Sequence, residues 1–178
     1  MKYNPLGRTG LYVSELCLGA MTFADPSSPM GQMLGGTGQE LATRMVDLAL
    51  DAGVNFIDTA NVYNAGRSEE IVGEAIAKRR SEWVLATKVG SSSGNTAPNT
   101  SGLNRKHIFN EIESSLRRLD TDYIDIHYLH KEDHSTPLEV TVSAIGDLIR
   151  EGKIRYWGVS NFRGWRIAEV VNVAQRLG

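Results

Sequence analysis

Short apolar runs alternate along the chain with longer segments whose apolar residues recur every three or four positions. The short runs predict strands at Glu15–Met21, Val54–Asp58, Trp83–Lys88, Tyr123–Leu129 and Ile154–Val159. The longer segments predict helices at about Thr37–Ala52, Ser68–Arg80, Arg105–Leu119, Thr136–Gly152 and Trp165–Leu177. Regular alternation of this kind predicts an α/β fold, with a parallel sheet and helices outside it.

Local signals mark where some helices begin. Thr37 and Glu40 have the spacing of a capping box, as do Thr136 and Glu139, where Pro137 also takes the first helical position. The apolar face of the first helix is predicted to consist of Leu41, Met45, Leu48 and Ala52. Both helices should therefore start at a threonine.

Glycine-rich segments separate the predicted elements. Turn glycines within Leu6–Leu11 predict a hairpin ahead of the first strand. Thr22–Gly36 and Gly90–Gly102 are rich in turn-forming residues and are predicted loops. We expect these two loops to border any pocket at the strand ends.

Two architectures satisfy this pattern, a doubly wound sheet and an eight-fold barrel. A doubly wound dinucleotide-binding sheet carries G-x-G-x-x-G after its first strand. Gly19 is followed by Ala20–Thr22, which does not fit, and the glycines at Gly35, Gly36 and Gly38 follow a loop. The barrel instead predicts catalytic groups at the carboxyl ends of successive strands.

Polar and ionisable side chains follow the predicted strands at the point where each strand ends. They are Asp58, Tyr63 five residues later, Lys88, His130, and the pair Ser160 and Asn161. Taken singly, each has an ordinary structural explanation, such as a capping aspartate or a solvated lysine. Because the carboxyl ends of parallel strands share one edge, we predict that these side chains form a single active-site cluster.

The residue types suit the reduction of a carbonyl group. Hydride addition builds negative charge on oxygen, so the site has to supply a proton at neutral pH. A tyrosine hydroxyl, with an ordinary pKa of about 10, becomes an effective acid–base group when a nearby cation favours its phenolate. We therefore expect Tyr63 to donate the proton, with Lys88 as the cation and Asp58 holding Lys88. His130 is expected to orient the carbonyl oxygen.

Composition narrows the classes of function. The 178 residues carry a formal net charge of -2, with 41% hydrophobic and 22% charged residues, typical of one globular domain. Lacking a basic surplus or an apolar run of about 18 residues, the sequence predicts no nucleic-acid or membrane partner. No Cys/His cluster offers a metal site. The one cysteine, Cys17, cannot form an internal disulfide, so we expect a cytoplasmic protein with Cys17 as an inert strand residue.

Several motifs resemble those of the aldo-keto reductases. The matching segments are Phe56-Ile57-Asp58-Thr59-Ala60-x-x-Tyr63, Ser68-Glu69-x-x-Val72-Gly73, Ala86-Thr87-Lys88, Ser115-Leu116-x-x-Leu119-x-Thr121-Asp122-Tyr123-Ile124-Asp125 and Gly158-Val159-Ser160-Asn161-Phe162. The opening Leu6-Gly7-x-Thr9-Gly10-Leu11-x-Val13-Ser14 is similar to the branch that includes bacterial aldehyde reductases and potassium-channel β-subunits. The resemblance covers essentially the whole chain, in order.

The resemblance implies a fold, a cofactor and roles for the clustered residues. The fold would be a TIM-type (β/α)8 barrel that binds NADP(H) across its upper face without a Rossmann fold. The catalytic tetrad would be Asp58, Tyr63, Lys88 and His130. Ser160 and Asn161 would contact the carboxamide of the nicotinamide.

The number of βα units departs from the family pattern. The family's barrel has eight units, typically over about 250 residues, whereas this sequence supplies a hairpin and about five units. We therefore expect residues 1–178 to form a single aldo-keto reductase-like domain, an incomplete barrel truncated at its C-terminus. Five parallel strands leave two open edges, which predicts self-association and weak NADPH binding.

Three functions are compatible with these features. The first is NADPH-dependent reduction of a small aldehyde or ketone to an alcohol. The second is a redox-sensing regulatory subunit, in which a bound nicotinamide reports to a partner. The third is an inactive half-barrel fragment.

Overall fold

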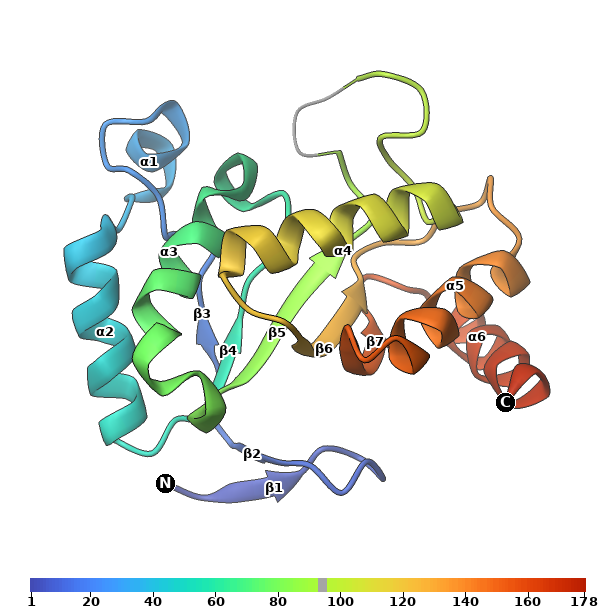
Figure 1. The fold of residues 1–178 in the computed structure, drawn as a ribbon, viewed down its shortest axis with the longest axis horizontal. Helices are drawn as coiled ribbons and strands as arrows, with labels where there is room; N and C mark the ends of the chain where they lie inside the picture. The colour runs from blue at the N-terminus through green and yellow to red at the C-terminus, as the bar shows by residue number, and fades with distance from the viewer. Residues whose placement is uncertain (93–95) are drawn as a thin grey trace.

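The computed structural model describes residues 1–92 and 96–178, and its centre is a five-stranded parallel sheet (Figure 1). The strands lie in chain order: β3 (Leu18–Gly19), β4 (Phe56–Asp58), β5 (Val84–Val89), β6 (Ile124–Leu129) and β7 (Ile154–Val159). Parallel neighbours in chain order require a crossover after every strand, and helices supply it. The predicted series of five βα units is confirmed. Residues 93–95 of the predicted loop at 90–102 lie outside the described residues.

Helices lie along one side of this sheet (Figure 1). They are α2 (Gln39–Asp51), α3 (Arg67–Ile76), α4 (Arg105–Leu119), α5 (Leu138–Arg150) and α6 (Gly164–Leu177), with short 3-10 turns at η1 (Tyr63–Gly66) and η2 (Ala77–Glu82). A buried apolar layer between sheet and helices includes Ile57, Leu85, Leu129, Ile108 and Ile145. No helix in the described part of the chain is both long enough and apolar enough to cross a membrane.

The predicted hairpin is present and lies beyond the amino ends of the strands (Figure 1). Strands β1 (Tyr3–Pro5) and β2 (Tyr12–Ser14) pair antiparallel. Val13 packs with Val84, Ala86 and Ile126 in an apolar cluster on the sheet face away from the helices. The hairpin therefore covers one end of the sheet, and the carboxyl ends of the strands stay open for chemistry.

The start of the first long helix differs from its prediction. Thr37 does not cap α2, because its backbone N–H bonds to Thr22 and its carbonyl accepts from Ala24, which fixes it in a loop. The helix begins at Gln39 after Gly38, with no side-chain cap. The second predicted capping box is also wrong, since the Thr136 hydroxyl donates to Asp133 instead.

The buried face of α2 also differs from its prediction. Leu41 and Leu48 are 54% and 67% exposed, whereas Ala42 and Val46 are buried. The helix carries apolar residues on two faces, and packing of α2 against α3 selects the face with the smaller side chains. The predicted loop at Thr22–Gly36 contains a further helix, α1 (Pro29–Leu34). The sequence did not predict this helix because turn-forming residues dominate the segment.

His127 on β6 is fully buried on the helix side of the sheet, away from the open face. Among the described residues, neither of its ring nitrogens has a hydrogen-bond partner. Burial lowers the pKa of His127 from 6.5 to about 4. Because side chains alternate along a strand, His127 and His130 lie on opposite faces of the sheet.

We expect acid to destabilise the fold through His127. Below pH 6.5 the His127 side chain binds a proton in the unfolded chain, whereas in the folded chain the buried imidazole stays neutral down to about pH 4. The free energy of unfolding should therefore fall by roughly 3 kcal/mol across that window because of this residue. Urea titrations at pH 7, 5.5 and 4 should show a smaller fall for His127→Leu than for the wild type. The control His134→Leu, at a largely exposed histidine 3.2 Å from Glu132, should change the pH dependence much less than His127→Leu does. Equal falls for wild type and His127→Leu would contradict the prediction.

Candidate active site

The Lys88 ammonium lies at the centre of the predicted cluster. Its side chain is 8% exposed, and its Nζ donates to Asp58 Oδ2 at 2.5 Å, to the Thr59 carbonyl at 2.7 Å and to the Tyr63 hydroxyl at 3.3 Å. An ammonium has three hydrogens to donate, so these three acceptors use all of them. The lysine is thus a buried, fully coordinated cation, and a solvated surface charge is excluded.

Two neighbouring strands place Asp58 beside Lys88. Asp58 ends β4, and Lys88 lies near the end of β5, paired in parallel register with β4. Because strand alternation is strict, both side chains leave the sheet on its open face. Parallel pairing of the two strand ends is therefore sufficient to place the carboxylate beside the ammonium.

Tyr63 begins the strained turn η1, five residues after the end of β4. Asn64 and Ala65 adopt φ values of 52° and 54°, a left-handed conformation that non-glycine residues rarely occupy. The Asn64 side-chain amide donates to the carbonyls of Met21 and Phe23, each at 2.9 Å. These bonds tie the turn to the loop after β3 and direct the phenol back toward Lys88.

His130 faces Tyr63 from the next strand. Its backbone N–H donates to the Val89 carbonyl at 2.7 Å, which extends the β5–β6 pairing by one residue. The two rings meet edge to face with centroids 5.8 Å apart. Burial, assisted by the positive charge of Lys88, lowers the pKa of His130, so the imidazole is neutral at pH 7 and offers one N–H donor.

Ser160 and Asn161 follow β7 and complete the row of strand ends. The Asn161 side-chain amide donates to the His130 carbonyl at 2.8 Å and to the Ser160 hydroxyl oxygen at 3.0 Å. Asn161 has a φ of 58°, which turns the chain away from the strand at this point. The structure thus brings all six predicted site residues to one edge of the sheet.

An open cavity of about 440 Å³ lies over part of this cluster, within the size range of small-molecule sites. Its lining includes Asp58, Lys88 and Ser160, together with Cys17 and Tyr128. Tyr128 is half-buried and packs against the apolar cluster that includes Val84, Ala86 and Ile126 on this face of the sheet. Its register partner is Lys88, so strand alternation in the sequence was sufficient to place it on the open face.

Cys17 precedes the two-residue strand β3, so its placement within a strand is wrong. The residue is exposed on the open side of the sheet, yet its thiol is desolvated. Burial of the thiol and the nearby Asp58 carboxylate raise the pKa of Cys17 to about 12. The thiol therefore stays protonated at neutral pH, in keeping with an inert group.

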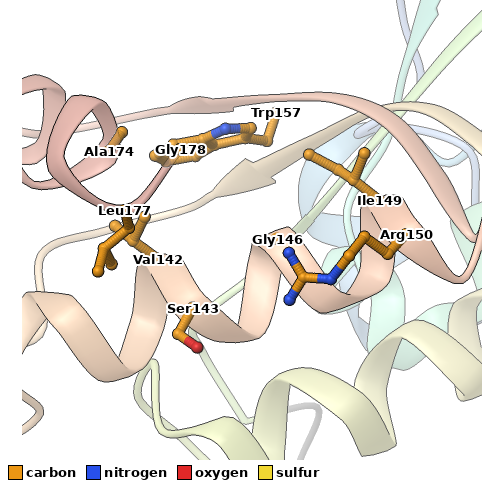
Figure 2. Close-up of a pocket in the computed structure, with 9 residues that line it drawn as sticks. All are labelled: Val142, Ser143, Gly146, Ile149, Arg150, Trp157, Ala174, Leu177 and Gly178. Carbon is orange, nitrogen blue, oxygen red and sulfur yellow. The ribbon is translucent and has the colours of Figure 1, made fainter.

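A second cavity, of about 180 Å³, lies between α5 and α6 over Trp157 (Figure 2). Its lining is mainly aliphatic and aromatic, with Arg150 as its one charged side chain. It lies on the helix side of β7, away from the strand-end cluster, where Trp157 packs against a buried apolar cluster. In the described residues, no group of three or more His, Cys, Asp or Glu side chains is arranged to hold a metal ion.

Comparison with known proteins assigns the family. A model described as "Aldo/keto reductase family" matches residues 15–176, nearly the whole chain. The chain belongs to the aldo/keto reductase family. Members of this family generally use nicotinamide cofactors. The fold of the family is the TIM barrel that the resemblance implied.

Two curated relatives of this aldo/keto reductase chain cover nearly all of it. It is 42% identical over 181 residues to a "Probable voltage-gated potassium channel subunit beta" of Oryza sativa subsp. japonica, which covers 99% of this chain and 52% of the relative. It is 41% identical over 186 residues to the "Uncharacterized oxidoreductase YrpG" of Bacillus subtilis, again covering 99% of this chain and 54% of the relative. The chain thus spans about half the length of these relatives.

A solved aldo/keto reductase structure has the same arrangement of strands and helices. The holo form of aldo-keto reductase AKR11C1 from Bacillus halodurans superposes with a TM-score of 0.84 at 37% identity, covering 98% of this chain and 55% of the other. The five βα units of this chain therefore correspond to part of a TIM barrel, and the predicted incomplete barrel is confirmed.

Proposed function

We propose that this chain carries the catalytic centre of an NADPH-dependent reductase of small aldehydes and ketones. The observation that carries the proposal is the position of Lys88, whose ammonium joins Asp58 and the Tyr63 hydroxyl in a buried site. A buried cation held by a carboxylate and in contact with a phenol is suited to acid catalysis by that phenol.

Each residue of the cluster has a separate task in the proposed reaction. Tyr63 donates its hydroxyl proton to the carbonyl oxygen as charge builds there. Lys88 stabilises the phenolate that remains, and Asp58 keeps the ammonium charged and in place. The neutral His130 donates a hydrogen bond to the same oxygen and fixes the approach of the carbonyl.

Ser160 and Asn161 fit a nicotinamide carboxamide by their hydrogen-bonding groups. The Ser160 oxygen accepts from Asn161, so its own hydroxyl hydrogen is available to a carbonyl in the cavity. The Asn161 side-chain oxygen can accept from an amide N–H on the same ligand. These two residues would hold the ring, and a bound NADPH would supply the hydride.

Cofactor binding and turnover, measured on the same purified chain, test this proposal. Fluorescence titration gives the affinity for NADPH, and loss of NADPH absorbance with a small aldehyde gives turnover. Reduction that depends on the Tyr63 hydroxyl supports the enzyme. NADPH binding without any reduction, across several aldehydes and ketones, would rule it out.

A redox-sensing regulatory subunit is the second candidate. The relative that favours it is the rice protein named as a probable potassium channel β-subunit, at 42% identity. In that role the chain would bind NADPH and a partner protein, and turnover would be dispensable. Binding of neither cofactor nor substrate would instead favour an inactive half-barrel.

We also propose that the chain self-associates through its open sheet edges. Among the residues that the structure describes, β3 and β7 each have a neighbouring strand on one side only, and unpaired backbone groups at such edges readily pair with another chain. The exposed side chains of Leu48 on α2 and Trp165 on α6 add apolar surface that a second copy could cover. Light scattering should give a mean mass above the 19.5 kDa of one chain, rising with concentration. A constant monomer mass up to the highest soluble concentration would contradict this.

A further inference from the structure

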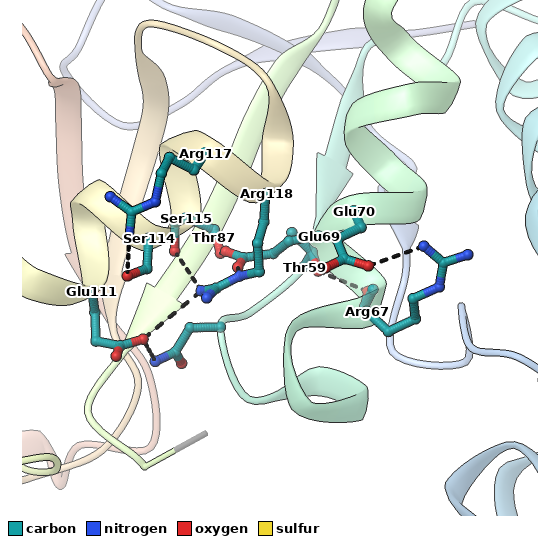
Figure 3. A network of polar contacts seen from close by, with 12 residues as sticks. Thr59, Arg67, Glu69, Glu70, Thr87, Glu111, Ser114, Ser115, Arg117 and Arg118 are labelled. Atoms are coloured by element: carbon teal, nitrogen blue, oxygen red, sulfur yellow. Dashed lines mark hydrogen bonds and ion pairs between the residues drawn. The ribbon is translucent and has the colours of Figure 1, made fainter. Parts of the chain in front are cut away.

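A buried polar network lies behind the catalytic cluster, on the helix side of the sheet (Figure 3). Its central residue is Glu69, in the first turn of α3, whose side chain is fully buried. One carboxylate oxygen accepts from the Thr87 hydroxyl at 2.5 Å and the other from Arg118 Nε at 2.6 Å. Glu69 has no place in the proposed chemistry, and a buried carboxylate is costly unless it is paired.

The network contacts the residues next to both strand-end catalytic groups. Thr87 directly precedes Lys88, and Thr59 directly follows Asp58. The Ser68 hydroxyl donates to the Ala20 carbonyl at 2.6 Å, so Thr59 is the donor in the 2.8 Å bond between the Thr59 and Ser68 hydroxyls. The first turn of α3 therefore holds both strand ends from behind through Ser68 and Glu69.

Arg118 extends the network to the turn that carries Tyr63. Its side chain packs against Gly66, the last residue of that turn, so closely that a Cβ there would lie 2.8 Å from Arg118 Cδ. The Arg118 guanidinium also lies 3.8 Å from Glu111, which accepts from the side-chain amide of Asn61 at 2.7 Å. Arg118 thus contacts the end of the segment between Asp58 and α3 directly, and approaches Glu111, which binds Asn61 near its beginning.

The contact that this scaffold supports has little tolerance for displacement. Lys88 Nζ and the Tyr63 hydroxyl are 3.3 Å apart, at the outer limit of a hydrogen bond. A shift of the turn by about 1 Å would break the bond, and misplacement of that size can cost about 10²-fold in rate.

We propose that Glu69 and Arg118 form a positioning pair that holds the Tyr63 turn against Lys88. Glu69, at the start of α3, binds Thr87 on β5 next to Lys88. Arg118 packs against Gly66 and so connects the turn to α4. Neither side chain contacts the cavity, so both act through other residues. The effect on catalysis rests on the proposed function, whereas the effect on the contact between Tyr63 and Lys88 does not.

The test compares four variants with the wild type: Glu69→Gln, Arg118→Met, the double variant with both changes, and the control Arg117→Met. Arg117 is the neighbouring arginine on α4, and its guanidinium donates to Ser114 one turn earlier. The first readout is the nuclear Overhauser effect between the Lys88 side chain and the Tyr63 ring, which are 4.8 Å apart from Nζ to ring centroid. The others are urea midpoint, NADPH affinity and kcat.

Glu69→Gln and Arg118→Met should each weaken the Overhauser effect at least several-fold and lower kcat by roughly 10²-fold. NADPH affinity should stay within about threefold of wild type, because the pair is remote from Ser160 and Asn161. The double variant should recover much of the urea midpoint, since the fully buried position 69 then carries no charge, without recovering the Overhauser effect. Arg117→Met should match the wild type throughout.

A wild-type Overhauser effect in folded Glu69→Gln or in the folded double variant would overturn the positioning role and leave only a structural one. If Glu69→Gln does not fold, Thr87→Val removes only the hydroxyl that reaches Glu69 and should weaken the effect at least twofold. An unchanged signal in Thr87→Val would likewise count against the proposal. Absence of turnover in the wild type would defeat the proposed function, while the Overhauser effect would still decide the positioning role.

Discussion

Replacing Tyr63 with phenylalanine should lower kcat for aldehyde reduction by roughly 10³-fold, the range of a lost general acid. The ring keeps its place in the turn, and the variant loses only the hydroxyl, whose partner is Lys88 at 3.3 Å. The free energy of unfolding should therefore change by no more than about 1 kcal/mol. NADPH affinity should also be close to that of the wild type.

A matched phenol elsewhere on the sheet provides the control for this variant. The Tyr156 hydroxyl donates to the Thr9 carbonyl at 3.4 Å, near the hairpin, and Tyr156 lies in the first half of β7. Tyr156→Phe should retain turnover within about twofold. If Tyr63→Phe retained even a tenth of wild-type turnover, a different group would have to supply the proton.

Replacing Lys88 with methionine should lower kcat by about 10² to 10³-fold, because the phenolate then forms without a cation beside it. The Asp58 carboxylate loses its partner at 2.5 Å, and the Thr59 carbonyl loses its donor. Some loss of stability should follow from the unpaired Asp58 carboxylate, whose side chain is 26% exposed and so partly hydrated. Steady-state kinetics and urea titration on the same samples separate the two effects.

Two further variants define the role of Lys88. Lys106→Met removes an exposed lysine on α4 and should leave turnover unchanged. Lys88→Met combined with Asp58→Asn should recover stability without recovering turnover, since the cation is still missing. Wild-type turnover in Lys88→Met at neutral pH would show that the ammonium is dispensable.

Much of the fold is predictable because the pattern of apolar and polar residues is consistent along most strands and helices. The helix at Arg105–Leu119 and the strand at Ile154–Val159 have the predicted bounds. The errors arise where tertiary contacts override local signals. Thr37 and Thr136 have capping-box spacing, yet each has a partner that only the folded chain provides. Periodicity likewise could not decide which face of α2 packs against α3.

The candidate site is predictable to the extent that it follows from strand ends and alternation. Parallel register alone brings Asp58 beside Lys88, and the same rule would have placed Tyr128 on the open face. The left-handed turn after Tyr63 has no signal of comparable strength, because Asn64 and Ala65 are not both typical of that conformation. Nor does the spacing of Glu69 and Arg118 predict their pairing, which depends on how α3 packs against α4.

The transfer of a proton from Tyr63 to the carbonyl oxygen is tested most directly by the solvent isotope effect. The measurement is the single-turnover rate of NADPH oxidation with a small aldehyde, in water and in deuterium oxide at equivalent pH. The tyrosine proton exchanges with solvent, so the rate should be lower in deuterium oxide. Reduction at equal rates in the two solvents would contradict proton transfer from Tyr63 in the step that consumes NADPH.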